Sequence, residues 1–257
     1  MSRSRYLAFA ALSIGALFFL WSVASALSES DLFIPSPVAV KDALMRLFVE
    51  RSFAQDVGIS VARIMAGFVL ATVLAVPIGV WMGVSRRVEA VVEPAADFIR
   101  YIPIPAFIPL FILWFGIGER EKVFVIAFSV FFQVVLMVAN SVALTPRPII
   151  ESAQTLGVTG WQLVIKVIYQ FARPKIWDDL RVSMGWAWAV LTIAEMVGAT
   201  SGIGFVIIQS QRLLQTPQVF GAIIVVGILG LISDGLFKWL YKVRFPWAPR
   251  TQNHVEI

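Results

Sequence analysis

Long apolar runs, separated by short polar segments, make up most of this chain. Five runs contain no Asp, Glu, Lys or Arg: Tyr6–Ser28, Ile64–Ser85, Tyr101–Gly118, Val123–Leu144 and Leu213–Ser233. A sixth run, Val182–Gln211, is interrupted only by Glu195. A helix needs about 20 apolar residues to cross a hydrocarbon core of ~30 Å, whereas a membrane barrel shows alternating strands of ~10 residues. The pattern therefore predicts an all-α polytopic membrane protein with six transmembrane helices.

Composition and charge support this class. Of the 257 residues, 59% are hydrophobic and only 14% are charged, against roughly 25% charged residues in ordinary globular chains. The net charge of +5 is not gathered into a basic stripe, so we expect no nucleic-acid partner. Most lysines and arginines fall in segments that six spans place inside, as the positive-inside rule requires. Both termini are therefore expected in the cytoplasm.

Four regions follow from these spans. Residues 1–30 form a first transmembrane anchor helix, 31–58 a periplasmic amphipathic segment, 59–245 a five-helix core, and 246–257 a cytoplasmic tail. The first run also fits a secretory signal, since Arg3 and Arg5 precede it and Ala24-Ser25-Ala26 resembles a cleavage site. Pro37 favours a helix start, because proline is tolerated in the first helical turn. We place a short amphipathic helix over Val38–Val49.

The sequence shows none of the common motifs of enzyme chemistry. The chain has no cysteine and a single histidine, His254, which excludes thiolate and histidine-built metal sites. It has no phosphate-binding loop and no nucleophile–base motif, so we expect no cofactor on this chain. A membrane-embedded enzyme remains an alternative, although the sequence shows no cluster of acids or bases that supports it. An ion-gradient-driven carrier is another, although such carriers usually show an internal repeat.

Several residues are candidates for a solute path or its gate. Pro105 and Pro109 at the start of the third apolar run predict a broken helix, which lines a water-filled cavity or is only an interfacial kink. Arg63 either snorkels to the interface or contacts solute. Glu195 either serves the path or accepts hydrogen bonds from backbone amides of the Gly198–Gly204 turn. Trp186 and Trp188 either line the path or pack. Asp234 and Lys238, four residues apart, are expected to pair.

The segment between the fourth and fifth spans differs from the rest. Its apolar positions recur at helical spacing, and Gly157 permits a tight corner between two short helices. Such a helix–glycine–helix segment, at 148–170, either docks into a groove of another protein or lies on the lipid surface. Glu151, Ala153 and Gly157 occur at the spacing E-x-A-x3-G, followed by Val167.

Four features occur in an order that resembles the permease subunits of ABC importers of the nitrate/sulfonate/taurine/bicarbonate type. They are Ile34-Pro35-Ser36-Pro37, Pro109-Leu110-(x)3-Trp114-Phe115-Gly116-Ile117, the Glu151–Gly157 spacing, and Ala194-Glu195-(x)5-Ser201-Gly202-Ile203-Gly204. The last feature adds Ser201 to the path candidates. Two departures stand out: Ser152 replaces the usual middle alanine, and Tyr169-Gln170 replaces the usual Leu-Pro, with Pro174 four residues later.

The resemblance implies a type I importer permease fold in the bacterial inner membrane, and a small, anionic cargo. It implies a homodimer on two copies of a separate ATPase, which carries ATP and Mg²⁺, and a periplasmic or lipid-anchored solute-binding protein. By the resemblance, the ATPase docks on the segment between spans four and five. The residues expected to couple are Glu151, Ala153, Leu156, Gly157, Val158 and Trp161.

Overall fold

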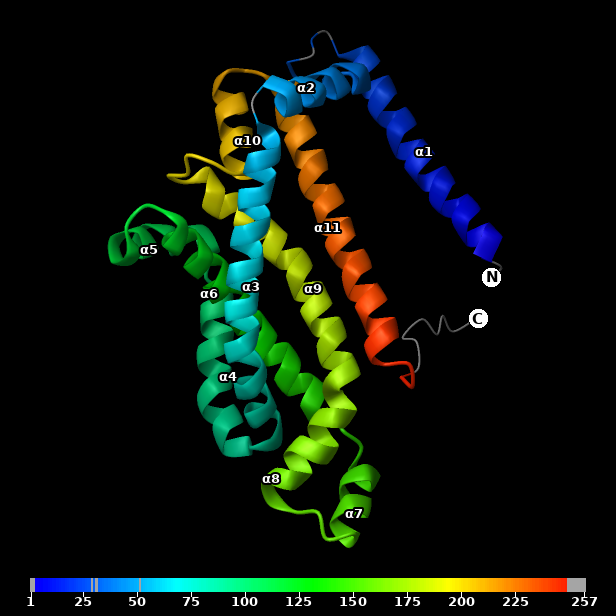
Figure 1. The fold of residues 1–257 in the computed structure, drawn as a ribbon, viewed down its shortest axis with the longest axis vertical. Helices are drawn as coiled ribbons and strands as arrows, with labels where there is room; N and C mark the ends of the chain where they lie inside the picture. Colours follow the sequence, from blue (N-terminus) through cyan, green and yellow to red (C-terminus); the bar gives the residue numbers. More distant parts are fainter. Residues whose placement is uncertain (1–2, 29, 31, 51, 249–257) are drawn as a thin grey trace. The chain divides into compact units, whose positions relative to one another are not determined.

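The computed structural model describes residues 3–28, 30, 32–50 and 52–248, and these residues form helices and turns without a strand (Figure 1). The predicted all-α class is confirmed. Of the predicted tail, residues 249–257 lie outside the described residues. The elements are α1 (Arg3–Leu27), α2 (Pro37–Glu50), α3 (Phe53–Val84), α4 (Arg86–Arg100), the 3₁₀ turn η1 (Ile104–Ala106), α5 (Ile108–Phe115), α6 (Glu119–Ala143), α7 (Arg147–Thr155), α8 (Gly160–Leu163), the π-helical turn η2 (Val164–Ile168), α9 (Tyr169–Met196), α10 (Ile203–Arg212) and α11 (Thr216–Arg244).

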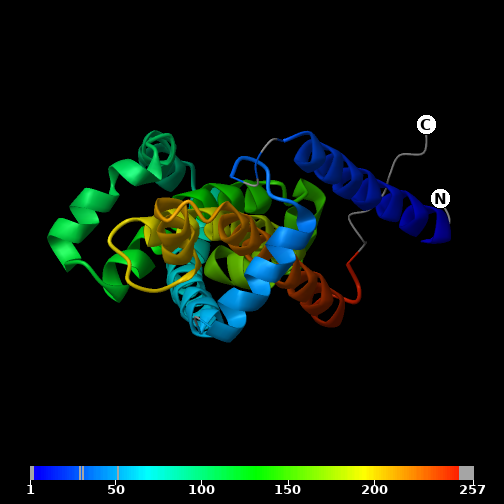
Figure 2. The same cartoon turned by 90° about the horizontal axis from the view of Figure 1, so that it is seen from above.

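Within the described residues, the helices α3, α6 and α11 are long and apolar enough to cross a membrane. A fourth span results if α4 and the η1–α5 segment, bent by 89°, count as one crossing. The bend is visible in Figure 1 and in the view from above in Figure 2. Helix α9 has 28 residues, but its first half carries several charges. The count of six spans stays a prediction.

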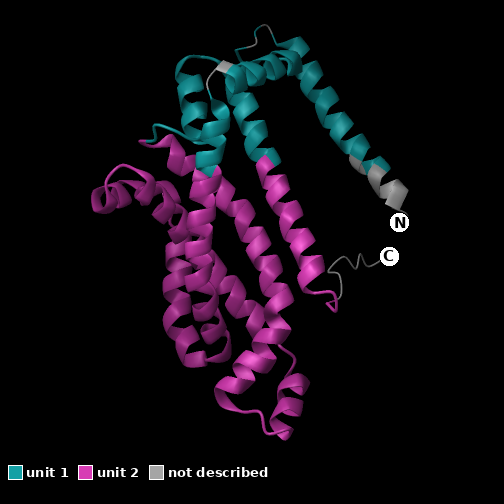
Figure 3. Ribbon diagram, in the orientation of Figure 1, with its two compact units in different colours: residues 1–60, 199–228 teal, residues 61–198, 229–257 magenta. Residues whose placement is uncertain are grey.

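The chain divides into two compact units, residues 1–60 with 199–228 and residues 61–198 with 229–257 (Figure 3). In the first unit, α2 buries Val40, Ala43 and Leu47, which confirms the predicted amphipathic helix. Its start is capped because the Ala39 amide donates to Ser36 Oγ at 3.1 Å. This unit also contains α1 and α10.

In the second unit, α6 packs along α9 and also contacts α4 and α5. Glycines of α3 bring its backbone against α6: a Cβ on Gly79 would lie 2.7 Å from Val135 O, and one on Gly83 would lie 2.6 Å from Ala139 O. Such close packing is typical of a Gly-x-x-x-Gly spacing like that of Gly79 and Gly83, because small residues let membrane helices approach.

The charged segment between α3 and the prolines near 103–109 has the composition of a loop between two spans, but it forms the helix α4. Ala96 of α4 is buried, whereas Val91 and Phe98 are exposed. The alternation of charged and apolar residues at helical spacing was the signal for this helix. The helix ends at Arg100, shortly before Pro103, since the residue preceding a proline disfavours the α conformation.

The glycine contacts of α3 generate a stability prediction. We expect Gly79→Ala to lower the free energy of unfolding by ~1–3 kcal/mol, because the new methyl group meets the α6 backbone and forces the helices apart. Gly235→Ala is the matched control, since no atom lies within 4 Å of its added Cβ. Thermal unfolding in detergent, followed by tryptophan fluorescence, compares the two; a Gly79→Ala protein as stable as wild type contradicts the packing.

Candidate functional site

Arg63 of α3 is buried among carboxylates of two other helices. Its Nη1 donates to Glu195 Oε1 of α9 at 2.8 Å, and its Nε donates to Glu119 Oε2 of α6 at 2.6 Å. Nη2 also donates to Glu119 Oε1. Only 3% of Arg63 and 1% of Glu195 are exposed, whereas the Glu119 side chain is 64% exposed. One guanidinium thus ties together three helices of the second unit.

This geometry corrects the sequence interpretation of Arg63. Snorkelling to the interface is wrong, because the guanidinium is enclosed and its charge is balanced by two carboxylates. Sequence reasoning missed this partner of Glu195, since 132 positions separate the two residues. In the Gly198–Gly204 turn, the amides of Gly202 and Ile203 donate to Asp56 Oδ1 at 2.6 Å and Ser60 Oγ at 2.9 Å. Donation from this turn to Glu195 stays a prediction.

A second group of charges joins α9 to α11. The predicted pair is confirmed, since Lys238 Nζ lies 2.6 Å from Asp234 Oδ2. Arg181 Nε also donates to Asp234 Oδ1 at 2.6 Å, and its Nη1 lies 3.5 Å from Asp178. Asp179, next to Asp178 in the sequence, instead accepts from Lys175 Nζ at 2.8 Å and from Ser141 Oγ. Each of these charged side chains therefore has an oppositely charged partner on α9 or on α11.

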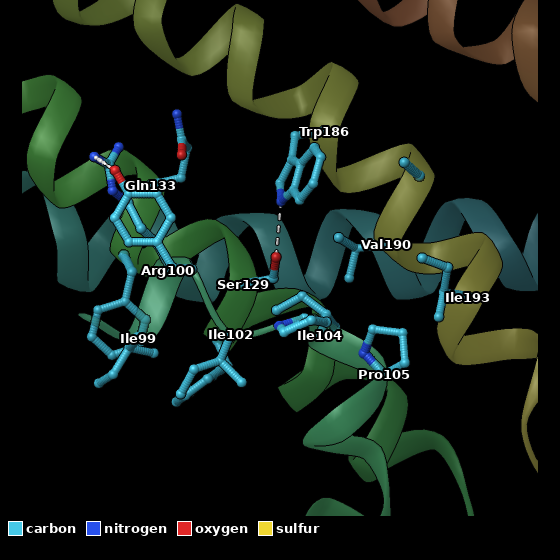
Figure 4. Close-up of a pocket in the computed structure, with 15 residues that line it drawn as sticks. Ile99, Arg100, Ile102, Ile104, Pro105, Ser129, Gln133, Trp186, Val190 and Ile193 are labelled. Atoms are coloured by element: carbon cyan, nitrogen blue, oxygen red, sulfur yellow. Dashed lines mark hydrogen bonds between the residues drawn. The ribbon is translucent and has the colours of Figure 1, made fainter. Parts of the chain in front are cut away.

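A cavity of about 340 Å³ lies where the α4–η1 link meets α6 and α9 (Figure 4). Of the path candidates, Pro105 and Trp186 line this cavity. Trp188 does not: it is buried, and its Nε1 donates to Ser233 Oγ at 3.2 Å, so packing is its role here. The remaining candidates, Arg63, Pro109, Glu195 and Ser201, are also absent from the lining.

The walls of the cavity are mostly apolar, with a few polar groups. Trp186 Nε1 donates to Ser129 Oγ at 2.9 Å across the cavity, which holds the indole ring in place. Figure 4 shows Arg100 and Gln133 on one side and Pro105 and Ile193 on the other. Sequence reasoning missed Arg100, Ser129 and Gln133, which gave no motif. A small solute with both a polar and an apolar part fits such a lining.

The segment 147–168 forms a protruding knuckle at the end of α6 and the start of α9 (Figure 1). Helix α7 ends in a Schellman motif: the Val158 amide donates to Ala153 O at 3.0 Å and the Gly157 amide to Gln154 O at 2.9 Å. Gly157 has φ +83, a left-handed conformation that favours glycine. The sequence thus correctly placed the corner.

The second half of the knuckle differs from the sequence prediction. We expected two separate short helices, but α8 continues through the π-helical turn η2 into α9. Pro174 therefore lies inside a helix and does not end one. Leu156 is 83% exposed and Trp161 is 62% exposed, so two large apolar side chains lie uncovered in this chain. Glu151 is exposed as well.

The buried arginine generates a prediction for stability. Arg63→Gln and Glu195→Gln should each cost ~3–5 kcal/mol of unfolding free energy, because either change leaves a buried charge without its partner. The double change Arg63→Gln with Glu195→Gln should cost less than the sum of the two single changes. Glu119→Gln is the control with a smaller effect, since water reaches that carboxylate. Additive losses in unfolding experiments in detergent would contradict the pairing.

Comparisons of the sequence with protein families and with known proteins show what this chain is similar to. The model of the family "binding-protein-dependent transport system inner membrane component" matches residues 75–243. The chain is 32% identical over 250 residues to the taurine transport system permease protein of Escherichia coli, covering 94% of this chain and 91% of that protein. It is 32% identical to a putative aliphatic sulfonates transport permease protein of Bacillus subtilis, covering 89% of this chain and 83% of that one.

Among solved structures, the fold is similar to a chain of the inward-facing MetNI methionine ABC transporter. The TM-score is 0.66 at 20% identity, and the match covers 74% of this chain and 94% of that one. This likeness confirms the importer permease fold that the sequence features implied. The family also decides among the three classes of function considered, because its members are transporter subunits that work with a separate ATPase. The chain belongs to the inner-membrane components of binding-protein-dependent transport systems, the permease subunits of ABC importers.

Proposed function

We propose that two copies of this chain form the path for a small anionic solute, and that a separate ATPase drives the path through the knuckle 147–168. The observation that carries the coupling role is the exposed pair Leu156 and Trp161 on either side of the fixed corner at Gly157. Apolar side chains on a rigid helical corner suit a groove of a partner protein. Glu151, Ala153 and Val158 complete the proposed contact.

The lipid surface is the other occupant considered for the knuckle. The exposed residues between Glu151 and Gln162 include Gln154, Thr155 and Thr159 as well as Leu156 and Trp161. Amphipathic helices that lie on membranes carry lysine and arginine on their polar face, and none lies between Arg147 and Lys166. This mixed tip, with Glu151 as its one charged residue and no basic residue, favours a protein groove over anionic lipid.

The α9 face beside the cavity supports pairing of two copies. A groove of about 590 Å³ runs along Val182, Gly185, Trp186 and Ala189, and Gln133 and Arg100 also line it. Hydrocarbon cannot satisfy an amide and a guanidinium, so protein or water has to cover such a face. Two-fold pairing of copies places the grooves opposite each other and encloses a path.

The direction and the cargo complete the proposal. We infer cytoplasmic termini, a periplasmic or lipid-anchored solute-binding protein on the outer side, and ATP with Mg²⁺ on two ATPase copies inside. The relatives named for taurine and aliphatic sulfonates support a cargo with an anionic sulfonate group, to which taurine adds an ammonium group, with nitrate and bicarbonate as the other solutes of the type. Pro105, Pro109, Trp186 and Ser201 remain candidates for the path, and Arg63 and Glu195 for its outer gate.

The coupling role is tested with changes in the knuckle. Glu151→Lys and Gly157→Pro should each reduce solute-stimulated ATP hydrolysis by at least about tenfold, because the first reverses a charge at the contact and the second excludes the left-handed corner. Both proteins should insert normally, since these residues are exposed. The assay uses the permease reconstituted with its ATPase and binding protein.

A matched control is Gly58→Ala, which adds a Cβ where no atom lies within 4 Å and which lies far from the knuckle in the sequence. It should couple like wild type. Wild-type stimulation in either Glu151→Lys or Gly157→Pro would overturn the docking assignment. Co-purification of the ATPase with wild type but not with Glu151→Lys gives a second, independent readout.

A further inference from the structure

We propose that Arg100 binds the anionic group of the solute within the path and that the solute it suits best is a short alkanesulfonate. This inference rests on the proposed function, since it assumes that solute passes through the cavity. The evidence comes from the charge, the partners and the surroundings of Arg100, a residue to which the sequence motifs gave no role.

Arg100 is the one charged side chain among the described residues that line the 340 Å³ cavity, and it also lines the 590 Å³ groove along α9. It lies at the end of α4, where the chain bends by 89° into the η1–α5 segment. The other polar side chains of the cavity are Ser129, Gln133 and Tyr101, which bear no charge. A charged solute in this cavity therefore meets one positive group, which selects anions when the solute replaces Asp97 as its partner.

The present partners of Arg100 are easily exchanged. Its Nε lies 2.9 Å from Asp97 Oδ1, with the two side chains 37% and 41% exposed. Its Nη2 donates to the Tyr101 hydroxyl at 3.2 Å, and its Cζ lies 4.9 Å from the centre of the Tyr101 ring. Ion pairs as exposed as this one contribute little to stability. Asp97 can thus hold the guanidinium when no solute is present and yield to an anion.

The geometry of the cavity favours an anion with an apolar part. A guanidinium presents a planar fork of donors that binds two oxygens of one group, as a sulfonate offers. Beyond Arg100 the walls are apolar and aromatic, with Ile102, Pro105, Phe132 and Trp186 among them. A short alkyl chain buries its surface there, whereas nitrate or bicarbonate leaves those walls without contact. The match points to alkanesulfonates.

The first measurement is binding to the purified full chain in detergent. Ethanesulfonate is titrated while tryptophan fluorescence is recorded, and ethyl methyl sulfone serves as an uncharged probe of similar shape. We expect saturable binding of ethanesulfonate only. Arg100→Gln should weaken this binding at least about tenfold, as expected for the loss of a charge-assisted bidentate contact, and Arg100→Lys should weaken it less. Trp186→Phe should remove most of the signal.

The matched control is Arg87→Gln, which removes the same charge from an exposed position of the same helix. It should bind ethanesulfonate like wild type. Equal binding of the sulfone and the sulfonate, equal binding by Arg100→Gln and wild type, or no saturable binding in wild type would overturn the proposal. Equal loss in Arg87→Gln would do so too, because it would indicate a general charge effect.

Uptake of labelled taurine and ethanesulfonate into proteoliposomes with the ATPase and the binding protein separates this inference from the proposed function. If the wild-type complex imports either solute but Arg100→Gln imports it equally well, the role of Arg100 fails and the permease function stands. If the wild-type complex imports neither taurine nor ethanesulfonate, the assignment of a sulfonate cargo fails. Loss of uptake in Arg100→Gln, with uptake retained in Arg87→Gln, supports both.

Discussion

The guanidinium of Arg63 defines the arrangement of the three helices that meet around it. A charge enclosed in a membrane protein is tolerated only if its partners are supplied by the protein itself, and here Glu195 and Glu119 come from two other helices. Because each partner comes from a different helix, none of the three can shift without breaking one of the contacts. The cavity lies on two of the same helices, α6 and α9, so its position depends on this arrangement.

Close backbone packing complements this polar tie. Gly79 and Gly83 remove the side chains that would separate α3 from α6, and in lipid such packing replaces the hydrophobic force that drives helices together in water. The charge network of Arg181, Asp234 and Lys238 joins α9 to α11 in a similar way. Helix packing and ion pairing together hold the helices of the second unit in a fixed arrangement. Packed helices and ion-pair networks of this kind carry energetic coupling between distant sites.

Backbone irregularities mark the two places where we locate function. The prolines after Arg100 stop one helix and turn the chain, and the cavity lies at this turn. At the knuckle, Gly157 closes a Schellman motif and the π-helical turn Val164–Ile168 leads directly into α9. A force applied to the knuckle therefore acts on the same helix that carries Trp186 and Glu195. The proposed coupling segment and the proposed path therefore share α9.

The sequence by itself determined the class of protein and the positions of several helix starts and breaks. Apolar run lengths specify membrane helices, and Pro37, Gly157 and the prolines near 103–109 mark breaks, because their effects on φ, ψ and hydrogen bonding act within a few residues. The order of motifs identified the family. The amphipathic helix α4 was also readable from its periodicity, but a short charged segment between two spans resembles an ordinary loop.

Only the tertiary structure decided which distant side chains meet. The partner of Glu195 is Arg63, 132 positions away in the sequence. Trp188 packs against α11, whereas Trp186 lines the cavity. Arg100 is the one charged side chain among the described residues that line this cavity. None of these follows from periodicity, because a helical pattern defines which face is apolar but not which neighbour covers that face. The pairing of faces depends on how whole helices pack, and this is a property of the fold.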